Sequence, residues 1–259
     1  MSSLIKLKLL TKIYTRKQEN FRKFKQELTS ALSELDVSIS SIMFDEYGFV
    51  TIELTGEDEV AGVNYLTHIF GKTQDLGEIK KGNIVKGYVC SSGKVGFGIF
   101  VDIGIKEPYM TDALLPLYNI REQLFQGQKI PVKKAINLYS LVDNFPLEIE
   151  IIEVSIGLKK IEAQLSENQL ELFQQWIEEG LDRLIIIGAL EKEITIALER
   201  SKHVDDIIAI EKLGWMEFSL TCKFNTSAKG LIPEIGRLLP KAKFEIFSPG
   251  AIKKALNND

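Results

Sequence analysis

The sequence predicts an α+β protein of three domains, with a small barrel of β-strands between two mixed domains. A chain of 259 residues is too long for one ordinary small domain. Helical and strand patterns alternate in both terminal thirds, whereas the middle third shows short strands separated by turns. We expect an N-terminal α+β domain at 1–79, a barrel at 80–166 and a C-terminal α+β domain at 167–259.

The N-terminal third reads as strand, helix, two strands and helix. Residues 3–14 alternate as a strand, and 15–35 place apolar residues at three- and four-residue spacing, as an amphipathic helix does. "VSISSIMF" and "FVTIEL" flank the turn "DEYG" and predict a hairpin. "GEDEVAGVNYLTHIF" carries acidic residues in its first turn and predicts a second helix.

The middle third follows the linker "GKTQDLGEIKKG". From Gly82 to about Ser166, short strands and turns predominate, which is typical of a small barrel. We expect no helix there beyond a turn near "NIREQLF".

The C-terminal third begins with a helix, "SENQLELFQQWIEEG". Ser166 is its expected N-cap, Gln169 stands at the capping-box position, and Gly180 follows its end. We predict the later elements in this order: strands "RLIIIGA" and "EITIALE", helix "KHVDDIIAIEKLG" closed by Gly214, strand "WMEFSLTCKF", short helix "AKGLIPEIGRLL" and strand "KAKFEIF".

Charge and composition narrow the function classes. Residues 80–160 carry 11 Lys/Arg against 8 Asp/Glu and form the only basic third of a chain with net charge −4, which favours a polyanionic partner. Two separate cysteines and two isolated histidines predict no disulfide framework and no metal site. We expect no membrane span, no cofactor and a cytoplasmic location. No catalytic constellation stands out, so we expect no enzyme.

The stretch "GKVGFGIFVDIG", residues 93–104, carries the most specific pattern. It follows "GNIVKGYV" and precedes "ALLPLYNI", "FQGQKIPVKK", "LEIEIIEV" and "KKIEAQLS". In this order the pieces resemble the S1 RNA-binding domain, a five-stranded OB-fold. The turn "LPLYNI" has Pro116 and Tyr118 where many S1 domains have a His or Ser, and looks more like the S1 domain of the tRNA-carrying initiation factor's alpha subunit.

The S1 resemblance implies an RNA site on the barrel. Aromatic rings stack on bases of any sequence, and nearby cations hold phosphates. The residues placed for this are Phe97, Phe100 and Tyr88 as platforms, Lys86, Lys94, Lys133, Lys134 and Arg121 as cations, and Tyr118 beside them. The alternative is that Phe97 and Phe100 belong to the barrel core. The loops "IKEPYMTD" and "KKAINLYSLVDNF" are long enough to reshape or cover this face.

The whole arrangement is similar to an uncharacterised archaeal family, with a C-terminal domain of ferredoxin-like type. The leading hypothesis is a non-enzymatic protein that binds structured RNA or the ribosome in translation or RNA processing. A protein adaptor of the transcription or translation machinery, with an apolar patch around Tyr118 and Tyr139, is the alternative. A third is an enzyme with a phosphate-binding loop near 225–230.

Two further features remain open in the sequence. One interpretation of Thr226, Ser227, Lys229 and Gly230 is a capped start of the predicted short helix. The alternative is that these residues form an anion site at that helix terminus. A run of basic residues near the first helix is either a solvated face or an extension of an RNA track. The run consists of Lys12, Arg16, Lys17, Arg22, Lys23 and Lys25.

Overall fold

The computed structural model describes residues 4–15, 17–155 and 157–257 and divides the chain into two compact units. The first unit is Met1–Gln74 and the second is Asp75–Asp259. The barrel and the C-terminal α+β domain therefore lie within one unit. The three domains and the central barrel are as predicted, whereas the finer domain boundaries stay predictions.

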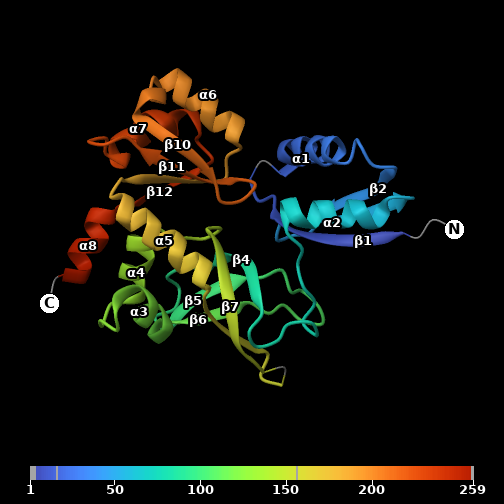
Figure 1. Cartoon of the computed structure of the whole chain (residues 1–259), viewed down its shortest axis with the longest axis horizontal. Coiled ribbons are helices and arrows are strands. Elements are labelled where there is room, and N and C mark those ends of the chain that lie inside the picture. Colours follow the sequence, from blue (N-terminus) through green and yellow to red (C-terminus); the bar gives the residue numbers. More distant parts are fainter. Residues whose placement is uncertain (1–3, 16, 156, 258–259) are drawn as a thin grey trace. The chain divides into compact units, whose positions relative to one another are not determined.

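The first unit is a three-stranded antiparallel sheet with two helices, in the predicted element order (Figure 1). Its strand order is β1-β3-β2. The elements are β1 (Ile5–Lys12), α1 (Lys17–Ala31), β2 (Val37–Phe44), β3 (Phe49–Gly56) and α2 (Glu59–Phe70).

Both helices of the first unit pack on one face of its sheet. Val50, Ile52 and Leu54 alternate along β3 and are fully buried. A Cβ at Gly62 of α2 would lie 3.5 Å from Leu32, just beyond α1, and 3.6 Å from Leu54. The sheet therefore buries one face against the helices and presents the other to its surroundings.

The second unit begins with a closed five-stranded barrel of order β4-β5-β6-β8-β7. The strands β6 and β8 pair in parallel, and all other neighbours pair antiparallel. This is the Greek-key order of an OB-fold barrel. The strands are β4 (Ile84–Cys90), β5 (Gly98–Asp102), β6 (Ala113–Pro116), β7 (Pro146–Ser155) and β8 (Lys160–Leu165).

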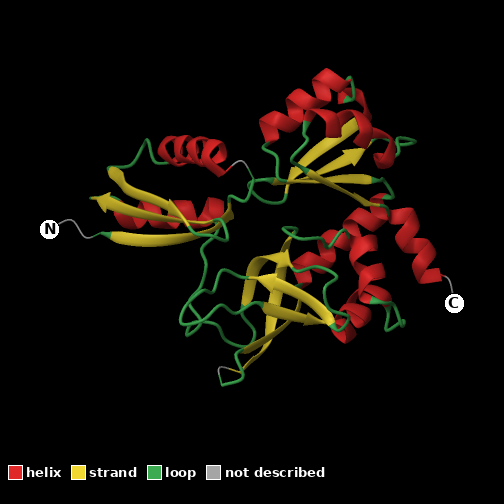
Figure 2. Cartoon of the chain, turned by 180° about the vertical axis from the view of Figure 1, so that it is seen from behind, coloured by secondary structure: helices red, strands yellow, loops and turns green. Residues whose placement is uncertain are grey.

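Two helices between β6 and β7 correct the expectation that the middle third has no helix beyond a turn near "NIREQLF". They are α3 (Leu117–Phe125) and α4 (Val132–Tyr139). The buried residues of α4 follow helical spacing, at Val132, Ala135, Ile136 and Tyr139. Figure 2 shows helices at one end of the barrel strands.

The C-terminal domain has the ferredoxin-like βαββαβ order, with a four-stranded sheet β10-β11-β9-β12. The helix α5 precedes it and α8 follows it. The elements are α5 (Glu167–Glu179), β9 (Arg183–Ile187), α6 (Glu191–Ser201), β10 (Ile207–Lys212), β11 (Glu217–Cys222), α7 (Ala228–Leu238), β12 (Lys243–Phe247) and α8 (Pro249–Asn257).

Two element types in this domain were predicted wrongly. "EITIALE" is part of helix α6, because Ile194, Ala197 and Leu198 face the core at three- and four-residue spacing. The expected helix around 202–214 is a short 3₁₀ turn (Val204–Asp206) followed by β10. The register of β10 shifts near Ile207, which breaks the alternation that identifies a strand. The sequence reading also omitted helix α8.

The start of α5 follows the predicted cap only in part. The Ser166 hydroxyl accepts a hydrogen bond from the Gln169 backbone N–H at 3.1 Å, and Gly180 closes the helix with φ of 70°. The Gln169 side chain does not complete a capping box. Its carbonyl oxygen instead accepts the backbone N–H of Glu148 in β7 at 3.0 Å. The cap thus ties α5 to the barrel.

Both faces of the C-terminal sheet are covered. Leu184 and Ile186 of β9 lie in the core with α6 and α7. On the opposite face, Trp176 of α5 contacts Phe247 of β12, with ring centroids 5.1 Å apart, and Arg183 lies over the Trp176 ring. Figure 1 shows α5 on the other side of the sheet from α6 and α7.

A cluster of buried aromatic rings joins the barrel to the C-terminal domain. Tyr139 of α4 contacts Phe173 of α5 at 5.2 Å and Phe247 of β12 at 5.9 Å, between ring centroids. Phe125 and Phe145 extend the cluster from the barrel side. Burial raises the pKa of Tyr139, whose hydroxyl donates to a backbone carbonyl. Tyr139 is 2% exposed, so the expected surface patch around it is wrong.

Candidate nucleic-acid interface

The strand β5 presents an aromatic pair on the outside of the barrel. Ile99 and Val101 are buried in the barrel core, whereas Phe100 between them points outward and is partly exposed. Phe97, just before the strand, is 58% exposed. The two phenylalanine rings meet edge to face, with centroids 6.1 Å apart and planes at 88°. Phe97 is therefore outside the barrel core.

Backbone contacts hold Phe97 in place. Its carbonyl accepts the N–H of Leu117 at 2.8 Å. At the next residue, Gly98, a Cβ would lie 2.4 Å from the carbonyl oxygen of Leu115 on β6. Glycine is required here because the two strands approach closely. At Gly96 a Cβ would meet nothing within 4 Å, so that glycine has no such role.

Pairing across the barrel brings Cys90, Leu114 and Glu162, which the sequence did not indicate, close to the predicted residues Phe100 and Tyr118. Phe100 pairs with Cys90 on β4 and with Leu114 on β6, and Leu114 pairs with Glu162 on β8. Tyr118 at the start of α3 is 60% exposed, and its hydroxyl lies 3.4 Å from Glu162. Only strand register identifies these neighbours, which lie far apart in the sequence. We call Cys90, Phe97, Phe100, Leu114 and Tyr118 the barrel patch.

The charges around the barrel patch are mixed. Glu162 forms an ion pair with Lys160 at 2.6 Å. Desolvation of the Tyr118 hydroxyl, and then the Glu162 carboxylate, raise the pKa of Tyr118, so the phenol stays protonated and can donate a hydrogen bond. Lys94 is exposed near the other end of the patch, with its ammonium 3.4 Å from the Ser91 hydroxyl.

Tyr88 is not a stacking platform in this structure. Its side chain is only 5% exposed. The opposite residue in the register, Asp102, is also buried and accepts bonds from Gly104 N–H and the Lys106 ammonium, both at 3.0 Å. The β5–β6 loop therefore folds back at this end of β5. It leaves Phe97 and Phe100 uncovered.

The other predicted cations lie in different places. Lys86 on β4 is exposed and lies 4.0 Å from Glu148, at the rim of a separate cleft. The Arg121 guanidinium donates to the Ile130 carbonyl at 2.9 Å and so has a structural role. Lys133 and Lys134 are exposed on α4. None of the four has a recorded contact with the barrel patch among the described residues.

The loop before α7 is poorly suited to an anion. Ser227 is the N-cap of α7, with no side-chain cap bond among the described residues. The Thr226 hydroxyl lies 3.4 Å from the carboxylate of Asp206, whose negative charge opposes an anion at this helix terminus. Lys229 and Gly230 are exposed, and a Cβ at Gly230 would meet nothing within 4 Å.

The basic run of the first unit is partly paired. Lys23 contacts Glu19 at 2.9 Å, and Lys12 lies over the Phe49 ring, 4.7 Å from its centroid. Arg22 and Lys25 are exposed. Arg16 and the side chain of Lys17 lie outside the described residues.

No group of three or more His, Cys, Asp or Glu side chains in residues 4–15, 17–155 and 157–257 is arranged to hold a metal ion. Among the same residues, no helix is long and apolar enough to cross a membrane.

Family models cover most of the chain. The models of the DUF2110 N-terminal, central and C-terminal domains match residues 6–76, 79–177 and 181–247. The chain belongs to the DUF2110 family. The model of the DUF2110 central domain spans the barrel and α5, and that of the DUF2110 C-terminal domain spans the ferredoxin-like sheet. No curated protein matches the chain in sequence.

Solved structures show distant similarity. An uncharacterised protein from Methanocaldococcus jannaschii is 16% identical, with a TM-score of 0.24, and the match covers 35% of this chain and 96% of that one. A chain of the a/eIF2alpha–aDim2p–rRNA complex from Pyrococcus horikoshii is 13% identical, with a TM-score of 0.26. That match covers 48% of this chain and 64% of the other. TM-scores this low support no inference about function.

Proposed function

We propose that the protein binds RNA through the barrel patch, as its S1-like strand pattern suggests, in translation or RNA processing. The observation that carries the proposal is the aromatic pair on β5. Phe97 exposes 58% of its surface beside Phe100, on a strand whose neighbouring residues Ile99 and Val101 are buried. An exposed phenylalanine beside a barrel strand can stack on a nucleic-acid base.

Stacking energetics support this role. A base stacked on an aromatic side chain contributes about 1–3 kcal/mol and needs no particular sequence. The Leu117 N–H bond fixes the backbone of Phe97 and the Phe100 ring contacts its side chain, so little ordering is needed when a base binds. The Tyr118 hydroxyl donates its one proton to Glu162, so its oxygen remains as a hydrogen-bond acceptor at the edge of the patch.

The electrostatic part of the binding is expected to be modest. Lys94 and Lys160 are the exposed cations nearest the patch in sequence and register, and Lys160 is paired with Glu162. For single-stranded RNA the slope of log K against log salt is about −0.7 per phosphate neutralised. Two phosphate contacts therefore predict a slope of roughly −1.4.

The proposal is tested by measuring RNA affinity after the rings of Phe97 and Phe100 are removed. The single changes Phe97→Ala and Phe100→Ala should each weaken binding of a short single-stranded RNA by about 5- to 150-fold, the equivalent of one lost stack. Phe224→Ala is the matched control, because Phe224 is 76% exposed in the C-terminal domain and away from the barrel strands. Equal affinities for Phe97→Ala, Phe224→Ala and the unchanged protein would rule out stacking on the patch.

A protein partner is the second candidate, and the acidic side of the barrel patch favours it. The carboxylate of Glu162 lies 3.4 Å from the Tyr118 hydroxyl, where its negative charge opposes a phosphate backbone. Met110 in the β5–β6 loop is 52% exposed. A protein partner on this surface would bind with little salt dependence, in contrast to the slope expected for RNA.

A further inference from the structure

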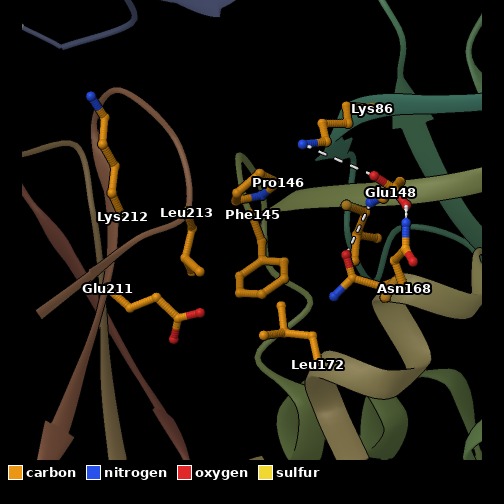
Figure 3. A pocket seen from close by; sticks show the side chains of 11 residues that line it. Lys86, Phe145, Pro146, Glu148, Asn168, Leu172, Glu211, Lys212 and Leu213 are labelled. Atoms are coloured by element: carbon orange, nitrogen blue, oxygen red, sulfur yellow. Dashed lines mark hydrogen bonds and ion pairs between the residues drawn. The ribbon is translucent and has the colours of Figure 1, made fainter. Parts of the chain in front are cut away.

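A cleft within the second unit separates the barrel from the C-terminal sheet. The start of β7 forms one wall, the first turns of α5 form the floor, and the β10–β11 hairpin forms the opposite wall (Figure 3). Its volume is about 230 Å³. It is separate from the barrel patch, since the two share no residue.

The walls of the cleft are apolar and partly flat. Phe145 and Pro146 line the barrel side, with Leu172 below and Leu213 opposite. Figure 3 shows Leu213 and the Phe145 ring on facing sides of the gap, with Leu172 below the ring. Apolar surfaces on two sides of a narrow gap suit a flat ring.

Gln169 supplies an unpartnered hydrogen-bond donor to this cleft. Its side-chain carbonyl accepts the Glu148 N–H at 3.0 Å, and this contact fixes the amide orientation. Among the described residues, its side-chain NH₂ group has no partner, although the residue is only 6% exposed. The NH₂ group is not sealed from the cleft, so it can donate to the acceptor atom of a ligand there.

Glu211 supplies an acceptor from the opposite wall. Its Oε2 accepts from the Trp176 indole at 3.2 Å and from the Arg183 guanidinium at 3.0 Å. Its Oε1 has no partner among the described residues. In Figure 3 its carboxylate is directed across the gap toward Phe145. These two bonds hold the carboxylate in position.

Cations border the cleft. Lys86 reaches the rim from β4, and Lys212 stands on the hairpin. The single recorded contact of the Lys86 ammonium within the described part of the chain is Glu148, at 4.0 Å. An ammonium at the mouth of an apolar cleft is placed for a phosphate outside it.

We propose that this cleft binds one nucleotide. The base lies between Pro146 and Leu213, which are both partly exposed, a carbonyl or ring nitrogen of the base accepts from Gln169, and an N–H of the base donates to Glu211. The phosphate meets Lys86 at the rim. A volume of about 230 Å³ is below the 300–1,000 Å³ of pockets for drug-sized ligands, so it suits one base rather than a larger cofactor.

The nucleotide comes either from a bound RNA strand or from the free pool, and photocrosslinking separates the two. The full chain is irradiated with 5-iodouridine monophosphate, or with a five-residue RNA containing one 5-iodouridine, and crosslinked peptides are mapped by mass spectrometry. We expect crosslinks near Phe145 or at 211–213. Crosslinking by the monophosphate alone identifies a free nucleotide, whereas crosslinking only by the RNA identifies a base from the strand.

The decisive variant is Gln169→Glu, which keeps the oxygen that accepts from Glu148 but replaces the NH₂ donor with a second oxygen. We expect at least a tenfold loss of cleft crosslinks. Gln174→Glu, with the same charge change on the same helix at an exposed position, should have no effect. If Gln169→Glu lowers stability, Leu213→Trp gives an independent test, because its larger side chain fills the gap from the hairpin.

The proposal is overturned if neither probe crosslinks to the cleft peptides, or if both cleft variants leave the crosslinks unchanged. It does not depend on RNA binding at the barrel patch. Phe97→Ala should leave cleft crosslinking by the monophosphate intact, so a failure at one site is distinguishable from a failure at the other.

Discussion

The close approach of β5 and β6 makes a quantitative prediction at two neighbouring glycines. At Gly98 an added Cβ would lie 2.4 Å from the Leu115 carbonyl oxygen and 2.8 Å from a Leu114 methyl group. At Gly96 it would meet nothing within 4 Å. The same substitution, glycine to alanine, thus meets backbone at one site and open space at the other.

The two substitutions should change the free energy of unfolding in opposite directions. Overpacking against backbone costs about 1–3 kcal/mol, so Gly98→Ala should lower the free energy of unfolding by this amount. Gly96→Ala should raise it by about 0.4–1 kcal/mol, because alanine restricts the unfolded chain. For a unit of this size, 1 kcal/mol corresponds to about 2–4 °C in Tm, so Gly98→Ala should lower Tm by about 2–12 °C.

Tryptophan fluorescence is the suitable assay. Both tryptophans of the chain, Trp176 and Trp215, lie in the second unit, so their emission follows the unfolding of that unit alone. RNA affinity measured on the same samples should fall for Gly98→Ala, because the clash with β6 displaces the strand that carries Phe100 and follows Phe97. Equal urea midpoints for the two variants would refute the close strand contact.

Three further predictions concern the second unit. Ser166→Ala should destabilise it by about 0.5–2 kcal/mol in urea unfolding, because the cap bond to Gln169 is lost, while Ser166→Thr should retain most stability. Phe173→Ala should cost about 3–5 kcal/mol by opening the buried aromatic cluster, whereas exposed Phe224→Ala should stay within about 0.5 kcal/mol; equal midpoints would contradict this. Burial, followed by Asp182 and Asp206, raises the pKa of Cys222 from 9.0 to about 11. Its contribution to stability is therefore present below pH 9 and lost as pH rises toward 11, by up to about 1.4 kcal/mol per pH unit, and Cys222→Ala should remove this slope.

The fold was predictable where local patterns and tertiary packing agree. The hairpin at 37–56 and helix α5 with its Ser166 cap follow from such patterns, whereas the order of the barrel strands was expected from the S1 resemblance. "EITIALE" was predicted as a strand because the β-branched residues at 194–196 favour strands. In the structure, Ile196 is 38% exposed, whereas Ala197 and Leu198 are buried on one side of helix α6. Tertiary packing decided between the two patterns.

The candidate site was predictable only in part. The S1 resemblance implied that Phe97 lies on an open face of the barrel, and the side chain is 58% exposed. Tyr88 is buried by tertiary packing around β4. The alternation of residues along that strand does not predict this burial. The cleft at Gln169 and Glu211 brings together residues about forty positions apart, and no local motif marks it.

The most direct measurement of RNA binding at the barrel patch uses its native cysteine. Cys90 pairs with Phe100 and is partly exposed, whereas Cys222 is fully buried with a raised pKa, so a thiol reagent at pH 8 should label Cys90 alone. A base stacked on Phe100 should slow this labelling in proportion to RNA occupancy. RNA that binds while Cys90 reacts at its unchanged rate would contradict the proposed site.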